Sequence, residues 1–166
     1  MATNPDNKNF LSPIGFQFAI QRLPNVNYFC TSASIPEISM GEVETPNPFI
    51  RLPNPGEKLA FGQLQLQFRV DEDLKNFQEI YDWMIGLGYP DEFQQRANVQ
   101  TKYGIFSDAS LLITTNQYKP NVDVKFVDLY PTSLSAVEFN IEQGDVEYLN
   151  ANVTFAYRRY TLTSVT

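Results

Sequence analysis

The residue types that carry enzyme and metal chemistry are scarce in this sequence. The chain holds one cysteine, Cys30, and no histidine. The missing histidine removes the commonest general base and metal ligand, and with it every Ser-His or Cys-His pair. One thiol without imidazole cannot build a structural zinc site or an intrachain disulfide. Because Cys30 lies in the apolar run 28–30, we expect a small core residue and not a nucleophile.

The acidic cluster Asp71-Glu72-Asp73 is the one group that suggests a metal. A calcium loop of this kind needs an oxygen ligand at its fifth position and glycine at its sixth, where Lys75 and Asn76 stand. Capping of a helix N-terminus, where acids favour the positive end of the dipole, explains the cluster better. Gly86-Leu87-Gly88 ends a helix, the wrong polarity for a phosphate loop.

No pair of carboxylates is singled out for glycoside hydrolysis. The sequence therefore predicts no catalytic residue, no cofactor and no metal, and we expect a protein that is not an enzyme.

The acidic cluster introduces a predicted helix over residues 71–86. Its apolar side chains recur at three- and four-residue spacing, which predicts that one stripe packs on a sheet. Trp83 lies off the centre of that stripe. Gly86, Gly88 and Pro90 end the helix. The stripe consists of Leu74, Phe77, Ile80, Tyr81, Met84 and Ile85.

The rest of the chain favours strands. Residues 63–70 alternate between apolar and polar types, as a half-buried strand does. Residues 16–23 and 27–35 predict a hairpin that turns at Pro24-Asn25, and residues 89–107 predict a long loop. Later strands are expected at 109–115, 122–129, 135–142 and 150–162. In the last of these, Arg158-Arg159 breaks the alternation, which a β-bulge would restore.

Residues 36–62 hold five of the eleven prolines, with short strand-like pieces at 37–45 and 49–52. An irregular loop is one interpretation, but a structureless loop of this length is uncommon in a compact domain. A long hairpin that projects from the body is the preferred one. Such a hairpin cannot bury its own apolar face, so it needs partners.

Length and charge set the remaining expectations. We expect an N-terminal arm at 1–13 and a single β domain at 14–166. The net charge of −7 disfavours adhesive binding to nucleic acid. The chain start lacks the features of a secretory signal, and no apolar stretch is long enough to span a bilayer, so we expect folding in a cytoplasm without membrane anchoring. The low charged fraction of 19% fits either buried interfaces or a merely polar surface.

Three stretches together resemble a known family. They are FQFAIQRL followed by YFCTSASIPEIS, then LQLQFRVDEDLKNFQEIYDWM, then VKFVDLYPTSLSAVEFN followed by ANVTFAYRRYTL. Over about residues 14–162, their order and pattern are similar to those of the tail tube proteins of contractile-tailed bacteriophages. The resemblance implies a mainly β fold, a β-barrel or sandwich subunit with one α-helix and a long projecting β-hairpin.

The same resemblance implies a structural role. Subunits close into hexameric rings, and the stacked rings form a channel for DNA ejection. The implied partners are further copies of the chain, sheath proteins and baseplate proteins, and DNA passes without specific binding. The implied location is the virion, after synthesis in the host cytoplasm. A baseplate protein that initiates the tube shares the fold and is equally compatible with the pattern.

Two sets of hairpin residues are candidate functional residues. Glu42 and Glu44 are expected to face the lumen, because an acidic wall repels phosphate; ordinary solvated charges are the alternative. The expected inter-subunit residues are Ile38, Met40, Val43, Phe49 and Ile50.

The alternative function of a different class is a monomeric β-sandwich that binds carbohydrate, since Tyr and Trp side chains can stack on sugars.

Overall fold

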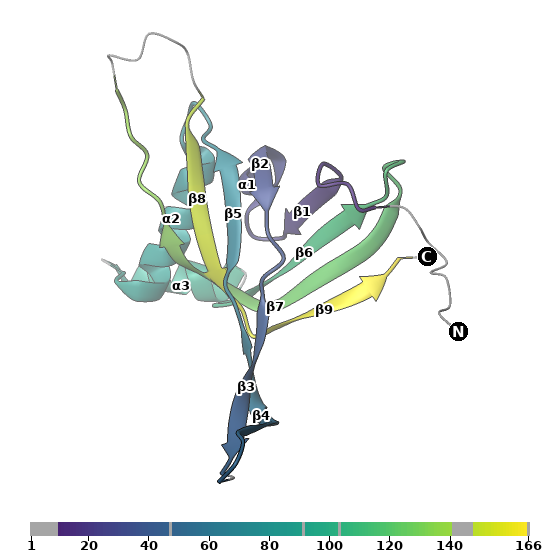
Figure 1. Ribbon diagram of the computed structural model, residues 1–166. Helices are drawn as coiled ribbons and strands as arrows, with labels where there is room; N and C mark the ends of the chain where they lie inside the picture. Colours follow the sequence, from purple (N-terminus) through teal and green to yellow (C-terminus); the bar gives the residue numbers. More distant parts are fainter. Residues whose placement is uncertain (1–9, 47, 91, 103, 141–147, 166) are drawn as a thin grey trace.

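The computed structural model describes residues 10–46, 48–90, 92–102, 104–140 and 148–165. The fold is mainly β, as the sequence predicts, and most of its strands form one strongly bent sheet (Figure 1). The strand order is β1-β6-β7-β8-β5-β2, and β9 pairs with β7. A separate two-stranded hairpin is formed by β3 and β4. The strands are β1 (Phe16–Ile20), β2 (Cys30–Ala33), β3 (Ile38–Thr45), β4 (Leu52–Phe61), β5 (Leu64–Arg69), β6 (Ser107–Thr114), β7 (Pro120–Leu134), β8 (Asn150–Ala156) and β9 (Arg159–Ser164).

The bend of the sheet lies in β7. The first half of this strand pairs with β6 and β9, and its second half pairs with β8. Between the halves, Asp128 takes a positive φ of 57°; the register shifts against β6 between Phe126 and Leu129, and against β8 between Pro131 and Ser133. Pro131 is tolerated in the second half because that half lies towards a sheet edge, where no N–H is required. The predicted strand 122–129 is thus part of a longer one.

The predicted hairpin over 16–35 is wrong. β1 pairs with β6 and β2 pairs with β5, and the short helix α1 (Pro24–Phe29) separates them. Pro24 occupies the first turn of that helix, where its missing N–H costs nothing. The Asn27 side chain accepts from the Ile20 N–H at 2.9 Å and donates to the Ile20 carbonyl at 2.8 Å. It therefore substitutes for a strand partner and ends β1.

The main helix is α2 (Lys75–Gly88), later at both ends than predicted. The acidic cluster does not cap it: the N-cap residue is Leu74, in a left-handed conformation, and the described residues form no side-chain capping hydrogen bond there. Instead, the fully buried Asn76 donates to the Arg69 carbonyl at 2.7 Å and accepts from the Asp71 N–H at 3.2 Å. Asn76 thereby joins the end of β5 to the helix.

The buried face of α2 is rotated from the predicted stripe. Ile80 and Trp83 are fully buried, Phe77 and Met84 are half-buried, and Tyr81 is 52% exposed. Leu74 is also exposed, at 41%. The Trp83 ring lies 6.2 Å from that of Phe155 on β8, so α2 covers the core side of the β5–β8 part of the sheet. The predicted loop 89–107 is also wrong in its middle, where helix α3 (Phe93–Lys102) lies beside α2 (Figure 1).

The C-terminal strands differ from the predictions in one further respect. Residues 135–140 form no strand, and the rest of the predicted strand 135–142 lies outside the described residues. The predicted strand 150–162 is two strands, β8 and β9, which turn at Tyr157-Arg158. The Arg158 N–H donates to the Val127 carbonyl at 3.0 Å. Both strands pair with β7, so the break in alternation marks the corner where they follow the bend of β7, and it is not a β-bulge.

Candidate assembly surface

The hairpin of β3 and β4 projects from the body, as predicted, at the bottom of the view in Figure 1. Its register runs from Ile38 opposite Phe61 to Thr45 opposite Leu52. A register shift between Met40 and Glu42 interrupts it. At this point the strands approach so closely that a Cβ on Gly56 would lie 2.3 Å from the Gly41 carbonyl oxygen. Glycine at position 56 is therefore required.

Every residue of β3 is exposed, and so are nearly all residues of β4. The exposed set includes large apolar side chains, which is unusual for a surface that stays in water. Phe49, between the strands, is 94% exposed. All five predicted inter-subunit residues belong to this set. It consists of Ile38, Met40, Val43, Phe49, Ile50, Leu52 and Leu59.

Proline gives the hairpin two unlike edges. Pro53 lies opposite Glu44 and Pro55 lies opposite Glu42. Because proline has no N–H, neither position can donate to β3, so both nitrogens face outward on the β4 edge. This edge cannot accept a further strand there, whereas β3 keeps its outward backbone donors. At these two positions the β4 edge therefore offers a neighbour only backbone carbonyls and side chains, and no backbone donor.

The two predicted lumen residues share one face of β3. Glu42 and Glu44 are two positions apart, so their side chains point the same way, and Val43 points the opposite way. Both acids are exposed. The Arg51 Nη1 lies 3.5 Å from Glu44 Oε1, an exposed ion pair that offsets part of the negative charge. The structure thus brings the two acids together but adds a cation that the sequence reasoning did not place beside them.

The base of the hairpin meets an aromatic cluster that the sequence reasoning missed. Phe61 at the end of β4 lies 5.6 Å from the ring of Tyr160 and 6.2 Å from that of Tyr157. Phe126 on β7 completes the cluster, 5.1 Å from Tyr157. Burial, with a smaller effect of Tyr160, raises the pKa of Tyr157 to about 12. The only sequence signal for the cluster was the interrupted spacing of aromatic residues near the C-terminus.

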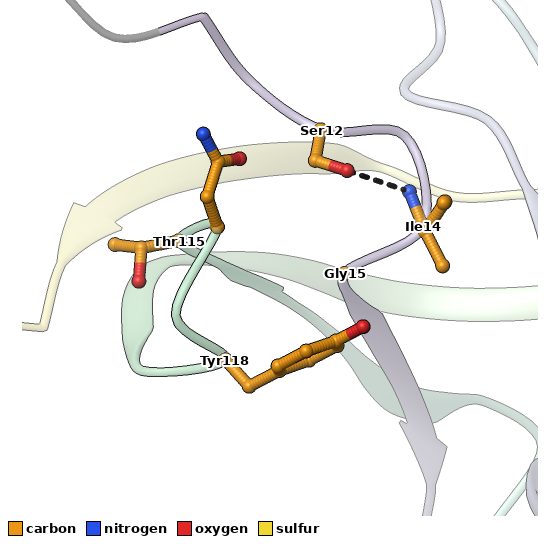
Figure 2. Close-up of a pocket in the computed structure, with 6 residues that line it drawn as sticks. Ser12, Ile14, Gly15, Thr115 and Tyr118 are labelled. Carbon is orange, nitrogen blue, oxygen red and sulfur yellow. Dashed lines mark hydrogen bonds between the residues drawn. The ribbon is translucent and has the colours of Figure 1, made fainter.

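A small hollow lies where the chain before β1 meets the β6–β7 turn (Figure 2). Its volume is about 120 Å³. The Ile14 N–H donates to Ser12 Oγ at 3.5 Å, and the Thr114 N–H donates to the Gly15 carbonyl at 2.9 Å. None of the lining side chains is charged, so the hollow offers no ionic anchor for a cofactor. The lining residues are Ser12, Ile14, Gly15, Thr115, Asn116 and Tyr118.

The groups considered for chemistry are not arranged for it in the described part of the chain. Burial raises the pKa of Cys30 to about 11, so the half-buried thiol is protonated at neutral pH. In the acidic cluster, Asp73 pairs with Lys75, which lowers the pKa of that carboxyl. Within the described ranges, no three acidic or cysteine side chains gather as a metal site. Each described helix is too short or too polar to cross a bilayer.

Comparison with known proteins gives a consistent result. The model of a family described as phage tail tube protein matches residues 3–163. A search of curated protein sequences finds no significant match.

Several solved structures have a similar fold. A chain of the sheath-tube complex of an extracellular contractile injection system has a TM-score of 0.66 at 16% identity, covering 95% of this chain and 94% of that one. A chain of the tube-terminating cap of the anti-feeding prophage has a TM-score of 0.68 at 16% identity, covering 98% and 97%. Hcp1 from Flavobacterium johnsoniae has a TM-score of 0.52 at 12% identity, covering 92% and 94%. At these identities the similarity shows a shared fold.

Proposed function

Because the chain belongs to the phage tail tube protein family, we propose that it is a structural subunit whose copies close into hexameric rings. The stacked rings form a channel through which DNA leaves a virion. The observation that carries this proposal is the projecting hairpin, with large apolar side chains that its own subunit does not cover. Burial of that surface against neighbouring copies supplies the driving force for assembly.

Two structural features determine how the hairpin makes contact. Phe49 and Ile50 lie in the connection between β3 and β4, where they are 94% and 62% exposed, and we assign them to a neighbouring copy. The β3 edge keeps its backbone donors and can pair with a strand of that neighbour, which would cover an edge that otherwise promotes uncontrolled association. In the body, β1, β2 and β9 each pair with a single strand, and contacts between copies can also cover their outer edges.

The lumen assignment rests on charge. Glu42 and Glu44 share one hairpin face, and we propose that this face lines the channel. A wall that carries acids does not release counterions from DNA, so phosphate does not adhere to it. The pair between Arg51 and Glu44 leaves Glu42 as the stronger contributor, because Glu44 shares its charge with the guanidinium.

The place along the tail has two candidates. The fold is similar both to a chain of a sheath-tube complex and to a chain of a tube-terminating cap, with nearly equal TM-scores. The repeating tube subunit, surrounded by sheath, is the first candidate. A specialised ring at one end of the tube, either a terminating ring or a baseplate ring that initiates the tube, is the second. Tube length is the observation that separates them: we expect a repeating subunit to stack into long tubes and a terminal ring to stop at one or two layers.

The test is the assembly state of the purified chain. Light scattering over a range of concentrations, followed by negative-stain imaging at the highest, should show rings or stacked tubes. A strict monomer at every concentration would refute the proposal and favour the alternative of a monomeric carbohydrate-binding module.

A further inference from the structure

The hairpin is joined to the body where the backbone ladder is interrupted. β2 and β5 form a ladder whose last bond is donated by the Ser34 N–H to the Gln65 carbonyl at 3.2 Å. The hairpin ladder begins with the Gly62 N–H donating to the Glu37 carbonyl at 2.9 Å. Between these bonds stands Pro36, which has no N–H. Where the backbone hydrogen bonds between two strands are interrupted, as at Pro36, the strand pair can bend.

A side chain from β9 replaces the missing connection. The Tyr160 hydroxyl donates to the carbonyl of the buried Pro36 at 3.2 Å. On the other leg of the hairpin, the ring of Phe61 packs edge-on against the same tyrosine at 5.6 Å. Tyr160 therefore contacts both legs at the joint. It is itself held 5.8 Å from Phe126 of β7, which is fully buried in the core.

We propose that Tyr160, supported by Tyr157, Phe61 and Phe126, is a clamp that fixes the direction of the hairpin relative to the body before subunits meet. This inference rests on the proposed function, because its value is to preorganise the hairpin for a neighbouring copy. A hairpin that already points in the bound direction loses less conformational freedom on association, which raises affinity without any new contact. Tyr160 acts as a positioning residue: it holds the hairpin, and the hairpin makes the contact.

The cluster contains its own matched control. The Tyr157 hydroxyl oxygen is buried and has no hydrogen-bond partner among the described residues. Tyr157→Phe therefore removes a hydroxyl that makes no hydrogen bond to the described residues, whereas Tyr160→Phe removes the hydroxyl that donates to the Pro36 carbonyl. Both changes keep an aromatic ring in the cluster. A third variant, Phe61→Leu, loosens the second leg and leaves both tyrosines in place.

The first experiment measures the direction of the hairpin directly. Spin labels are placed at Lys58→Cys on β4 and Lys119→Cys in the β6–β7 turn, both exposed sites, in a Cys30→Ala background. Double electron–electron resonance on dilute, unassembled protein should give one narrow distance distribution for the parent. We expect Tyr157→Phe to match it, and Tyr160→Phe and Phe61→Leu to broaden it. An unchanged distribution in Tyr160→Phe would overturn the clamp.

The second experiment measures assembly in the label-free chain. Loss of one hydrogen bond corresponds to a rise of about two- to tenfold in the concentration of half-assembly for Tyr160→Phe. Tyr157→Phe should show no rise. If Tyr160→Phe broadens the distances yet assembles like the parent, the role in assembly is refuted. A parent that never assembles would refute the proposed function, whereas the distance measurement would still decide the clamp.

Discussion

The orientation of α2 can be tested with two substitutions two residues apart. The structure buries Trp83 to 1% exposure, while Tyr81 is 52% exposed on the opposite side of the helix. The sequence stripe had placed Tyr81 inside and Trp83 away from its centre. Tyr81→Ala and Trp83→Phe therefore distinguish the observed orientation from the predicted one.

The expected cost at Trp83 follows from its contacts. Its ring packs against Phe155, its Nε1–H donates to the Ile105 carbonyl at 3.3 Å, and the Arg22 guanidinium carbon lies 4.4 Å from the ring centroid. Trp83→Ala would remove all three contacts. A large buried aromatic residue replaced by alanine costs about 3–5 kcal/mol. The lost cation–π contact adds about 0.5–1 kcal/mol.

That sum, about 3.5–6 kcal/mol, reaches the lower end of the stability of a typical domain, about 5–15 kcal/mol, so Trp83→Ala could unfold the protein. Trp83→Phe is the better variant, because it keeps a ring in place and loses the N–H donor and part of the packing. We expect it to cost about 1.5–3 kcal/mol. Tyr81→Ala, a surface change, should stay within about 0.5 kcal/mol.

The assay is urea unfolding followed by far-UV circular dichroism, since Trp83 is the one tryptophan of the chain and its fluorescence is lost in the variant. The parent protein should also show the blue-shifted emission of a buried indole. If Tyr81→Ala destabilises the protein more than Trp83→Phe does, the helix presents its other face to the sheet and the reasoning fails.

Three further predictions concern the hairpin and the thiol. Replacement of residues 38–58 by a short Gly-Ser turn should leave a folded monomer that no longer forms rings, because the hairpin adds little to the core of its own subunit. Circular dichroism measures folding and light scattering measures ring formation. Unfolding of the body or persistence of rings would each contradict the prediction. The double variant Glu42→Lys, Glu44→Lys should assemble and retain DNA at low salt but release it as salt rises, while the parent retains none; an assembled variant that ignores DNA would remove these residues from the lumen. Because burial raises the pKa of Cys30 in the folded state to about 11, above its ordinary 9.0, alkylation of the thiol should be slow at pH 8 and accelerate towards pH 11. The stability that this group contributes is complete below pH 9 and should fall as pH rises towards 11. Rapid alkylation of the folded protein at pH 8 would refute the burial of the thiol.

The local pattern of apolar and polar residues was sufficient to predict an element whose structure depends mainly on its own residues. The alternation of apolar and polar residues in 64–69 predicts a strand even without knowledge of its partner strands, because one face is apolar and the other polar. The apolar spacing after Lys75 likewise produces a helix. The prolines of 36–62 predicted a hairpin that projects, because they exclude a central strand and the segment has no second apolar face. The candidate hairpin residues could therefore be named from the sequence.

Strand partners and the rotation of α2 were decided by the tertiary structure. β1 and β2 are close in sequence yet pair with β6 and β5, because α1 intervenes and each strand pairs where its apolar face meets the core. The polar residue Asn76 lies on the buried face of α2, so the apolar pattern did not reveal that face. Its amide forms its hydrogen bonds with the backbone at the end of β5, a contact that only the tertiary structure shows.

The aromatic clamp has the same origin. It joins Phe61, Phe126 and Tyr160, which are far apart along the chain and meet at a corner of the sheet. Interactions between near neighbours in the chain determined elements such as β5 and the main part of α2, whereas the pattern did not reveal α1, α3 or the buried face of α2. The tertiary structure determined which faces meet, because such long-range contacts depend on how the whole sheet bends.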